Sequence, residues 1–246
     1  MTTIKNIIKS FWAKIREGFF RKQIKKLNDD SYFVAEKVPI FAQWESKELV
    51  NDILNEKIKA GDDSKWQQSG AKSKEEYVMY SWQACGMACL KMILKAIYPQ
   101  KDYQIVDLMK KAEKFGVYKR NNKTDIRYNL DGAFHGPLAK FVRTFDVIGS
   151  RKWGVRKYYL SHLILKNCFI IASVHSSIRD NSLHFDEKGG HLVLLKGFEV
   201  ENNQITGFYI NNPSGFHKES QENHFINLKH WQRCFSGNII IVIKKR

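Results

Sequence analysis

Residues 82–98 read WQACGMACLKMILKAIY, and this stretch decides the fold. Within residues 87–98 the only charges are Lys91 and Lys95, which are four positions apart and therefore share one narrow stripe of a helix. The other side chains there are apolar, so we predict a helix that is largely buried. Cys85 and Gly86 stand where the polar sequence before them gives way to this helix.

The segments on either side of this helix predict its neighbours. Helical patterns come before it at residues 45–59 and 71–84, and weaker ones follow it at residues 104–115, 137–145 and 158–166. In the last third, short stretches rich in Ile, Val and Phe predict strands at residues 168–176, 191–200, 205–211 and 238–244. Helices first and strands later, without regular alternation, indicate an α+β domain with an antiparallel sheet.

The composition is that of a globular protein with an unusual charge. Of the 246 residues, 43% are hydrophobic, 27% charged and 13% aromatic, which argues against disorder. No apolar run approaches the roughly 18 residues that a membrane-spanning helix needs, and lysines interrupt the N-terminus where a secretory signal would be apolar. Four cysteines without an export signal are expected to be free thiols in the cytoplasm, with export by a non-classical route as the alternative. The net charge of +16 bears on anionic partners but does not choose a fold.

The first 28 residues differ from the rest of the chain. Apolar side chains recur at spacings of three and four, as in an amphipathic helix, at Ile4, Ile7, Ile8, Phe11, Trp12, Ile15, Phe19 and Leu27. The other face is basic, with Glu17 as its one acidic residue. Such a helix could lie on an anionic membrane, dock to a partner, or pack on its own domain with a solvated basic face. We therefore expect a basic helical arm at residues 1–30 and one domain at residues 38–246, with a helical insertion at about residues 45–84.

Cys85 is the candidate nucleophile. A cysteine at the start of a helix meets the positive end of the helix dipole, which favours the thiolate over the thiol. Cys89 lies one turn further along the same side, and we expect it to be a small core residue. A buried and unreactive thiol is the alternative for Cys85 as well.

A nucleophilic cysteine needs a base, and His191 is the best placed because it begins an apolar strand directly after two glycines. If residues 202–203 form a two-residue turn, paired residue numbers in the hairpin sum to 405. Asn212 then lies opposite Val193, on the sheet face that carries His191, while Asn211 points to the other face. One bulge would reverse this assignment. Cysteine, histidine and an amide side chain form the constellation of papain-like catalysis, in which the third residue orients the imidazole.

Four stretches carry a resemblance: residues 38–43 (VPIFAQ), 85–94 (CGMACLKMIL), 191–198 (HLVLLKGF) and 211–215 (NNPSG). In order and spacing they resemble the opening strand, nucleophile helix, histidine strand and Asn-Asp-Pro-Ser-Gly turn of one family. That family is the bacteriocin-processing, double-glycine leader peptidase-like cysteine peptidases, in their stand-alone branch. The resemblance implies a papain-like fold, in which a helical part carrying the nucleophile helix packs on an antiparallel sheet. It leaves the N-terminal amphipathic helix uncovered.

The resemblance also implies the catalytic residues. Cys85 takes the place of the nucleophile, His191 that of the base, and Asn212 stands where the family has an orienting aspartate. The family's oxyanion glutamine stands a few residues before the cysteine. Gln43, whose Val-Pro context matches, is 42 positions upstream, so the helical segment between would be an insertion. Gln83, two residues before the cysteine, is the second choice.

The function expected from these residues is hydrolysis of a peptide or protein substrate by a cysteine peptidase. An imidazolium–thiolate pair of His191 and Cys85 attacks the carbonyl carbon and forms an acyl-enzyme. A thiol acyltransferase or amidase on the same fold is an alternative, because fold does not fix function. No cofactor is expected, and a zinc site built from Cys85, Cys89 and His191 would lack the usual second ligand pair.

A non-enzymatic basic protein that binds nucleic acid or membrane is the remaining alternative. Basic and aromatic residues alternate as on a surface that tracks phosphates and stacks bases, at Lys119, Arg120, Lys123, Arg127, Arg151, Lys152, Arg156 and Lys157, with Tyr118, Tyr128, Trp153 and Tyr158. No recognisable nucleic-acid-binding motif accompanies them, and a solvated surface would show the same pattern.

Overall fold

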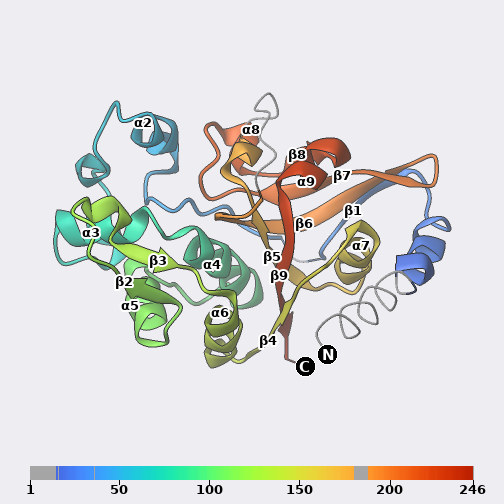
Figure 1. Cartoon of the computed structure of the whole chain (residues 1–246), viewed down its shortest axis with the longest axis horizontal. Helices are drawn as coiled ribbons and strands as arrows, with labels where there is room; N and C mark the ends of the chain where they lie inside the picture. Colours follow the sequence, from blue (N-terminus) through green and yellow to red (C-terminus); the bar gives the residue numbers. More distant parts are fainter. Residues whose placement is uncertain (1–14, 16, 36, 180–187, 246) are drawn as a thin grey trace, which may run out of the picture.

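The computed structural model describes residues 15, 17–35, 37–179 and 188–245 (Figure 1). Within these residues, a seven-stranded antiparallel sheet has the order β4-β9-β5-β6-β7-β8, and β1 also pairs with β6. Its strands are β1 (Asp30–Phe33), β4 (Val147–Lys152), β5 (Phe169–Val174), β6 (His191–Glu201), β7 (Gln204–Asn211), β8 (His224–Asn227) and β9 (Phe235–Lys244). A separate ribbon is made of β2 (Tyr118–Arg120) and β3 (Leu130–Gly132).

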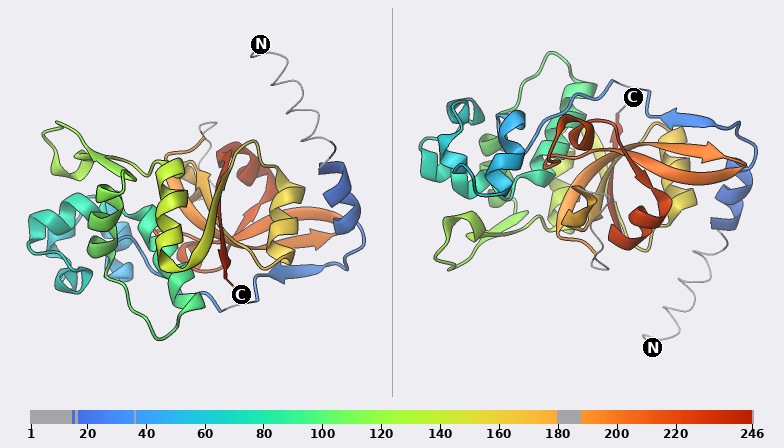
Figure 2. Two further views of the ribbon diagram at one scale, coloured as in Figure 1. Left: turned by 90° about the horizontal axis from the view of Figure 1, so that it is seen from below. Right: turned by 90° about the horizontal axis from the view of Figure 1, so that it is seen from above.

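Helices cover both faces of the sheet. α4 (Cys85–Ile97) and α7 (Lys157–Leu165) both pack against β5 and β6, and they stand on opposite sides of the sheet (Figure 2). Further helices are α2 (Val50–Leu54), α3 (Lys74–Ser81), α5 (Ile105–Lys114), α6 (His135–Val142), α8 (Lys218–Gln221) and α9 (Leu228–Cys234). Every side chain of β5 is buried because the strand is covered on both faces. The predicted α+β class with an antiparallel sheet is confirmed.

α4 is the buried helix that the sequence predicts. Residues 86–90 are all buried, and the two lysines of the helix are half-buried. The Lys91 Nζ lies 4.6 Å from the centroid of the Phe41 ring, so the charge is placed over an aromatic face. A Cβ atom on Gly86 would lie 3.0 Å from Leu192 Cδ1 of β6. A glycine at this position therefore lets the helix approach the strand closely.

The hairpin of β6 and β7 follows the predicted turn. Residues 202–203, both asparagine, have φ angles of 50° and 60°, as a type I′ turn requires. Pairing begins at Glu201 and Gln204, whose numbers sum to 405. Two shifts of register follow and cancel, so that Leu194 pairs with Asn211 and the sum is again 405. The predicted alternation of faces is thus restored at the open end of the hairpin.

The segment before α4 is less helical than predicted. Within residues 45–59, helical structure is confined to a 3-10 turn at Lys47–Leu49 and to α2. The helix ends there because the Lys57 N–H donates to the Asp52 carbonyl and Glu56 takes a left-handed φ of 56°. In the predicted helix at residues 71–84, α3 begins only after Ser73.

The sequence patterns do not predict β1, β2, β3, β4 and β8, nor the short helices α8 and α9. The segments of the missed strands read DSYF, YKR, LDG, VIGSRK and HFIN, in which polar and charged residues break any alternation. β1, β4 and β8 each pair along one edge with a longer strand. Tertiary pairing, rather than local propensity, therefore determines these elements.

The described end of the N-terminal arm packs on the rest of the chain. Within the helical residues 17–24, the Phe20 ring stacks on His162 with 4.1 Å between centroids and lies 5.4 Å from the Tyr159 ring. The Glu17 carboxylate accepts hydrogen bonds from two backbone N–H groups in the first turn of α7. The sequence allows this arm to lie on a membrane, to dock to a partner or to pack on its own domain. For residues 17–24, the structure shows the third arrangement.

Residues 1–14 and 16, which make up most of the predicted amphipathic helix, lie outside the described part of the chain. No helix within the described part is both long and apolar enough to cross a membrane. All four cysteines are free thiols, as predicted.

Substituting the arm's two adjacent phenylalanines tests this packing. Phe20→Ala should lower the free energy of unfolding by about 2 kcal/mol, because it removes a buried ring from the surface of α7. Phe19 is 67% exposed, so Phe19→Ala should change that free energy by less than about 0.5 kcal/mol. Urea denaturation of the three proteins measures both values, and equal losses would contradict the described packing.

Candidate active site

Cys85, the first residue of α4, lines a cavity of about 480 Å³. The same cavity is lined by His191 at the start of β6 and by both candidate oxyanion residues, Gln43 and Gln83. Asn212 is fully buried and follows the end of β7. The backbone N–H groups of the first turn of α4 lack intrahelical acceptors, so they face this end of the helix with partial positive charge.

His191 is held by the backbone before it and by a side chain beside it. Gly189 and Gly190 have φ angles of 91° and 88°, a left-handed conformation that favours glycine. The imidazole is 4% exposed, and its Nε2 lies 2.8 Å from Asn212 Oδ1. Because an amide oxygen only accepts, Nε2–H is the donor and a neutral ring keeps its lone pair on Nδ1.

The backbone orients the amide of Asn212. Its Oδ1 also accepts the N–H of Ser214 at 3.1 Å, and a second donor on the same atom identifies it as the oxygen. The backbone N–H of Asn212 donates to the carbonyl of Gln221 at 2.7 Å. Asn211 has a different partner, because its Oδ1 accepts the N–H of Asn223. Of the two asparagines, Asn212 is therefore the one that contacts the imidazole, as the predicted register requires.

Two further polar side chains join this group, and neither is among the candidate site residues predicted from the sequence. Ser214 Oγ lies 3.1 Å from His191 Nε2, and it accepts a hydrogen bond from Arg179 Nε at 2.9 Å. Ser214 belongs to the Asn-Pro-Ser-Gly turn, which gives a signal for it. Arg179 ends a 3-10 turn at Ser176–Arg179, where no motif marks it.

The charges around the cavity favour a neutral resting site. Burial, and then the nearby Arg179 guanidinium, lower the pKa of His191 to about 3, although the hydrogen bond to Asn212 opposes this change. Burial raises the pKa of Cys85, while backbone N–H groups and Arg179 act to lower it. These directions favour a thiol beside a neutral imidazole. They do not favour the imidazolium–thiolate pair expected from the sequence.

The two glutamines occupy different surroundings within the cavity. The backbone N–H of Gln43 donates to the Pro213 carbonyl at 2.9 Å, which ties it to the turn that carries Asn212. The Nε2 of Gln43 has only a long contact of 3.5 Å to the Trp82 carbonyl. The Nε2 of Gln83 donates to the Arg127 carbonyl at 3.3 Å. Gln43 is therefore joined to the histidine–asparagine group, and Gln83 to the loop before β3.

A second histidine, His135 at the start of α6, lines the same cavity. Burial and then Arg151 lower its pKa. Within the described part of the chain it has no hydrogen-bonded amide or carboxylate partner that would orient the ring. It therefore serves as an internal comparison for His191.

Cys89 is a core residue, as expected. It is fully buried, burial raises its pKa, and its thiol donates to the Leu192 carbonyl at 3.6 Å. Across residues 15, 17–35, 37–179 and 188–245, no three His, Cys, Asp or Glu side chains are grouped as a metal site would require.

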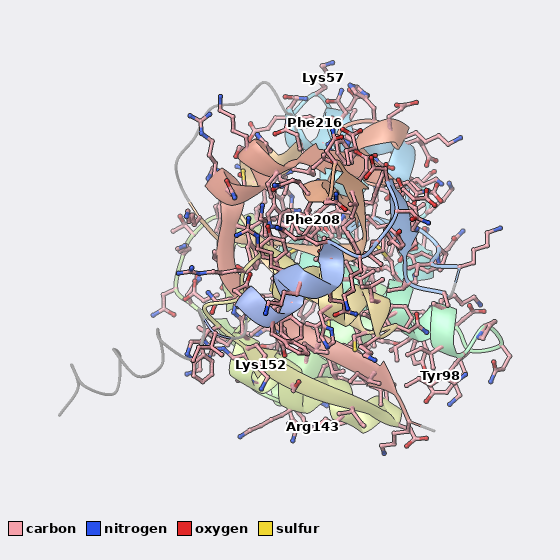
Figure 3. The ribbon with its side chains drawn as sticks, turned by 90° about the vertical axis from the view of Figure 1, so that its right-hand side faces the viewer. Lys57, Tyr98, Arg143, Lys152, Phe208 and Phe216 are labelled. Atoms are coloured by element: carbon pink, nitrogen blue, oxygen red, sulfur yellow. The ribbon has the colours of Figure 1, made fainter. Side chains whose placement is uncertain are left out.

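The residues suggested for nucleic-acid binding include a buried tyrosine and two arginines that already form ion pairs. Tyr118 is 1% exposed, so the expectation that it stacks on bases is wrong. Arg120 pairs with Glu113, and Arg127 pairs with both Asp125 and Glu56. Lys152 at the end of β4 and Arg143 directly after α6, both labelled in Figure 3, are exposed to solvent.

The fold described above, with a buried helix packed on an antiparallel sheet, is the papain-like peptidase fold. Residues 36–236 match the Peptidase_C39 like family, and the chain belongs to this family. Membership confirms the resemblance seen in the sequence and indicates a peptidase. No curated protein matches the chain.

Three solved structures are similar to the chain at low identity. A putative C39-like peptidase from Bacillus anthracis is 13% identical, with 66% of this chain and 89% of that chain covered and a TM-score of 0.44. The peptidase domain of Streptococcus ComA, a bi-functional ABC transporter, is 15% identical, with 66% and 92% covered and a TM-score of 0.42. A double glycine motif protease from an AMS/PCAT transporter, in complex with the leader peptide, is 16% identical, with 89% and 100% covered and a TM-score of 0.42.

The buried imidazole makes stability depend on pH. Since the pKa of His191 is about 3 in the folded chain and about 6.5 when unfolded, only the unfolded state binds this proton between those values. The contribution of the neutral imidazole to the free energy of unfolding is therefore complete above about pH 6.5. It is lost at about 1.4 kcal/mol per pH unit as the pH falls from about 6.5 toward about 3. His191→Gln should therefore lose less stability than the wild type between pH 7 and pH 5. Urea denaturation at both pH values measures this, and parallel losses would show that the imidazole does not resist protonation.

Proposed function

We propose that the chain is a cysteine peptidase that hydrolyses peptide bonds through Cys85, His191 and Asn212. The observation that carries the proposal is the 2.8 Å contact between His191 Nε2 and Asn212 Oδ1, beside a cavity that Cys85 also lines. This contact leaves Nδ1 of a neutral imidazole free to accept a proton, which a general base requires. Membership of a peptidase family supports the reaction class.

In the first step, the sulfur of Cys85 forms a bond to the carbonyl carbon and its proton passes to His191 Nδ1. The electron pair of the C=O double bond moves onto oxygen, where the Cys85 backbone N–H and the Gln43 amide would donate hydrogen bonds. The C–N bond then breaks as His191 returns the proton to the leaving amine. Water attacks the acyl-enzyme, giving its proton to His191, and the thiol is released.

A neutral pair at rest suits this sequence of steps. The amide of Asn212 orients the imidazole but, lacking charge, stabilises the imidazolium less than a carboxylate would. Burial also disfavours the imidazolium. We therefore propose that the charged form exists mainly during attack, with proton transfer accompanying bond formation.

Labelling with an epoxysuccinyl peptide, an electrophile that mimics a substrate, tests the nucleophile and the base. The wild type should be modified at Cys85, and His191→Ala should slow this modification by about 10² or more, because the base is lost. His135→Ala is the matched control, since it removes the second histidine in the described lining of the cavity, and its labelling should equal that of the wild type. Mass spectrometry of the digested protein locates the label.

Two outcomes would contradict the proposal. One is equal labelling of the wild type and His191→Ala, and the other is preferred labelling of Cys89, Cys168 or Cys234. Cys85→Ser should abolish the label at this site while keeping a similar side-chain volume.

Substituting the two glutamines separately tests the oxyanion assignment. Gln43→Ala should lower the turnover rate by about 10² or more, because one donor to the oxyanion is lost. Gln83→Ala should lower it by much less, since that amide already donates to the Arg127 carbonyl. The measurement is the rate at which new ends appear in a proteome-derived peptide mixture, followed by mass spectrometry. A larger loss for Gln83→Ala would reverse the assignment.

A further inference from the structure

Arg179 brings a positive charge into the cavity that the proposed mechanism does not use. The 3-10 turn that ends in Arg179 directly follows β5, and Val174 of β5 pairs with His191 of β6. This pairing places the turn beside the start of β6, and Arg179 lines the cavity together with Cys85 and His191. The guanidinium interacts electrostatically with both of these groups.

The side chain of Arg179 is anchored at one nitrogen only. Its Nε donates to Ser214 Oγ at 2.9 Å, and that hydroxyl is 3.1 Å from His191 Nε2. The two terminal nitrogens make no hydrogen bond to any residue in the described part of the chain. They form the fork of parallel N–H groups with which a guanidinium binds a carboxylate.

Among the described residues, the charge of Arg179 also has no acidic partner. No ion pair joins Arg179 to a described residue, and the described lining of the cavity contains no aspartate or glutamate. Arg127, near the same cavity, differs, because Asp125 and Glu56 both pair with it. Burial lowers the pKa of Arg179, so the site holds a partly desolvated cation at a cost. A cation kept at such a cost in a reaction cavity is suited to an anionic ligand.

We propose that Arg179 binds a carboxylate of the substrate, so that the peptidase selects peptides with a carboxylate next to the scissile bond. This inference rests on the proposed function and specifies its substrate class. The carboxylate belongs either to an aspartate or glutamate side chain or to the C-terminus of the peptide. Both present the same planar pair of oxygens to the fork. The net charge of +16 favours the approach of such substrates.

Alkylation of Cys85 by two small reagents tests the carboxylate site without any peptide hydrolysis. Iodoacetate and iodoacetamide both form the S–C bond with loss of iodide and of the thiol proton, but only iodoacetate carries a carboxylate. In the wild type, the rate constant at Cys85 for iodoacetate relative to iodoacetamide should exceed that at the other cysteines. Arg179→Gln should lower this ratio by about tenfold. Arg179→Lys should keep part of it, because the charge remains without the fork.

Arg127→Gln is the matched control, because it removes a nearby arginine whose charge is already paired, and its ratio should equal that of the wild type. If Arg179 only stabilised the thiolate, Arg179→Gln would slow both reagents equally and leave the ratio unchanged. That outcome would overturn the proposal. Mass spectrometry of the digested protein gives the rate at each cysteine, and the iodoacetamide rate shows whether the variant keeps its cavity.

Peptides identify the source of the carboxylate. In one set of peptides, all C-termini are amidated, and peptides with an internal aspartate or glutamate are compared with peptides that carry asparagine or glutamine there. In a second set without acidic side chains, peptides with a free C-terminus are compared with peptides whose C-terminus is amidated. Preference for the internal acids, or for the free ends, identifies the source, and Arg179→Gln should remove that preference. Equal cleavage of all peptides would overturn the proposal. If the wild type cleaves none of them, the proposed function fails, and the alkylation ratio still decides the role of Arg179.

Discussion

β6 is hydrogen-bonded along both of its edges, to β5 and β1 on one side and to β7 on the other. Its first residue, His191, therefore lies between Val174 of β5 and the end of β7. The turn after β5 carries Arg179, and Asn212 follows the end of β7. A slip of one residue in either pairing would turn the imidazole to the other face of the sheet. The candidate site depends on this double register, because His191, Asn212 and Arg179 lie at or just beyond the ends of three neighbouring strands.

The electrostatics of the site follow from the same arrangement. The imidazole is buried, its orienting partner is a neutral amide, and the guanidinium of Arg179 is a described charge that acts on it. In the described lining of the cavity there is no carboxylate. Among these described groups, the negative charge that would develop on sulfur and on the carbonyl oxygen meets only positive or neutral side chains.

The sequence predicts the parts of this structure that follow local rules. The buried helix at Cys85, the strand at His191 and the asparagine turn between the hairpin strands all show in the pattern of residues. The face of Asn212 was predicted from parity, and it holds because two register shifts cancel, which no local pattern reveals. Arg179 could not be predicted, because its contact with Ser214 spans 35 positions and depends on how β5 aligns with β6. The missed strands are rich in polar residues. β1, β4 and β8 form because longer strands offer them an edge, and β2 and β3 form by pairing with each other.

The absence of a side chain at Gly86 has a mechanical consequence. The space that a methyl group would need is already filled by Leu192, one residue after the histidine, and the Tyr118 hydroxyl oxygen would lie only 3.3 Å from it. The distance between α4 and β6 is thus limited by hard contact between buried atoms. Cys85 and His191 are therefore attached to closely packed and rigid elements. Thermal motion of surface loops would change access to the cavity more readily than it would change the separation of these two side chains.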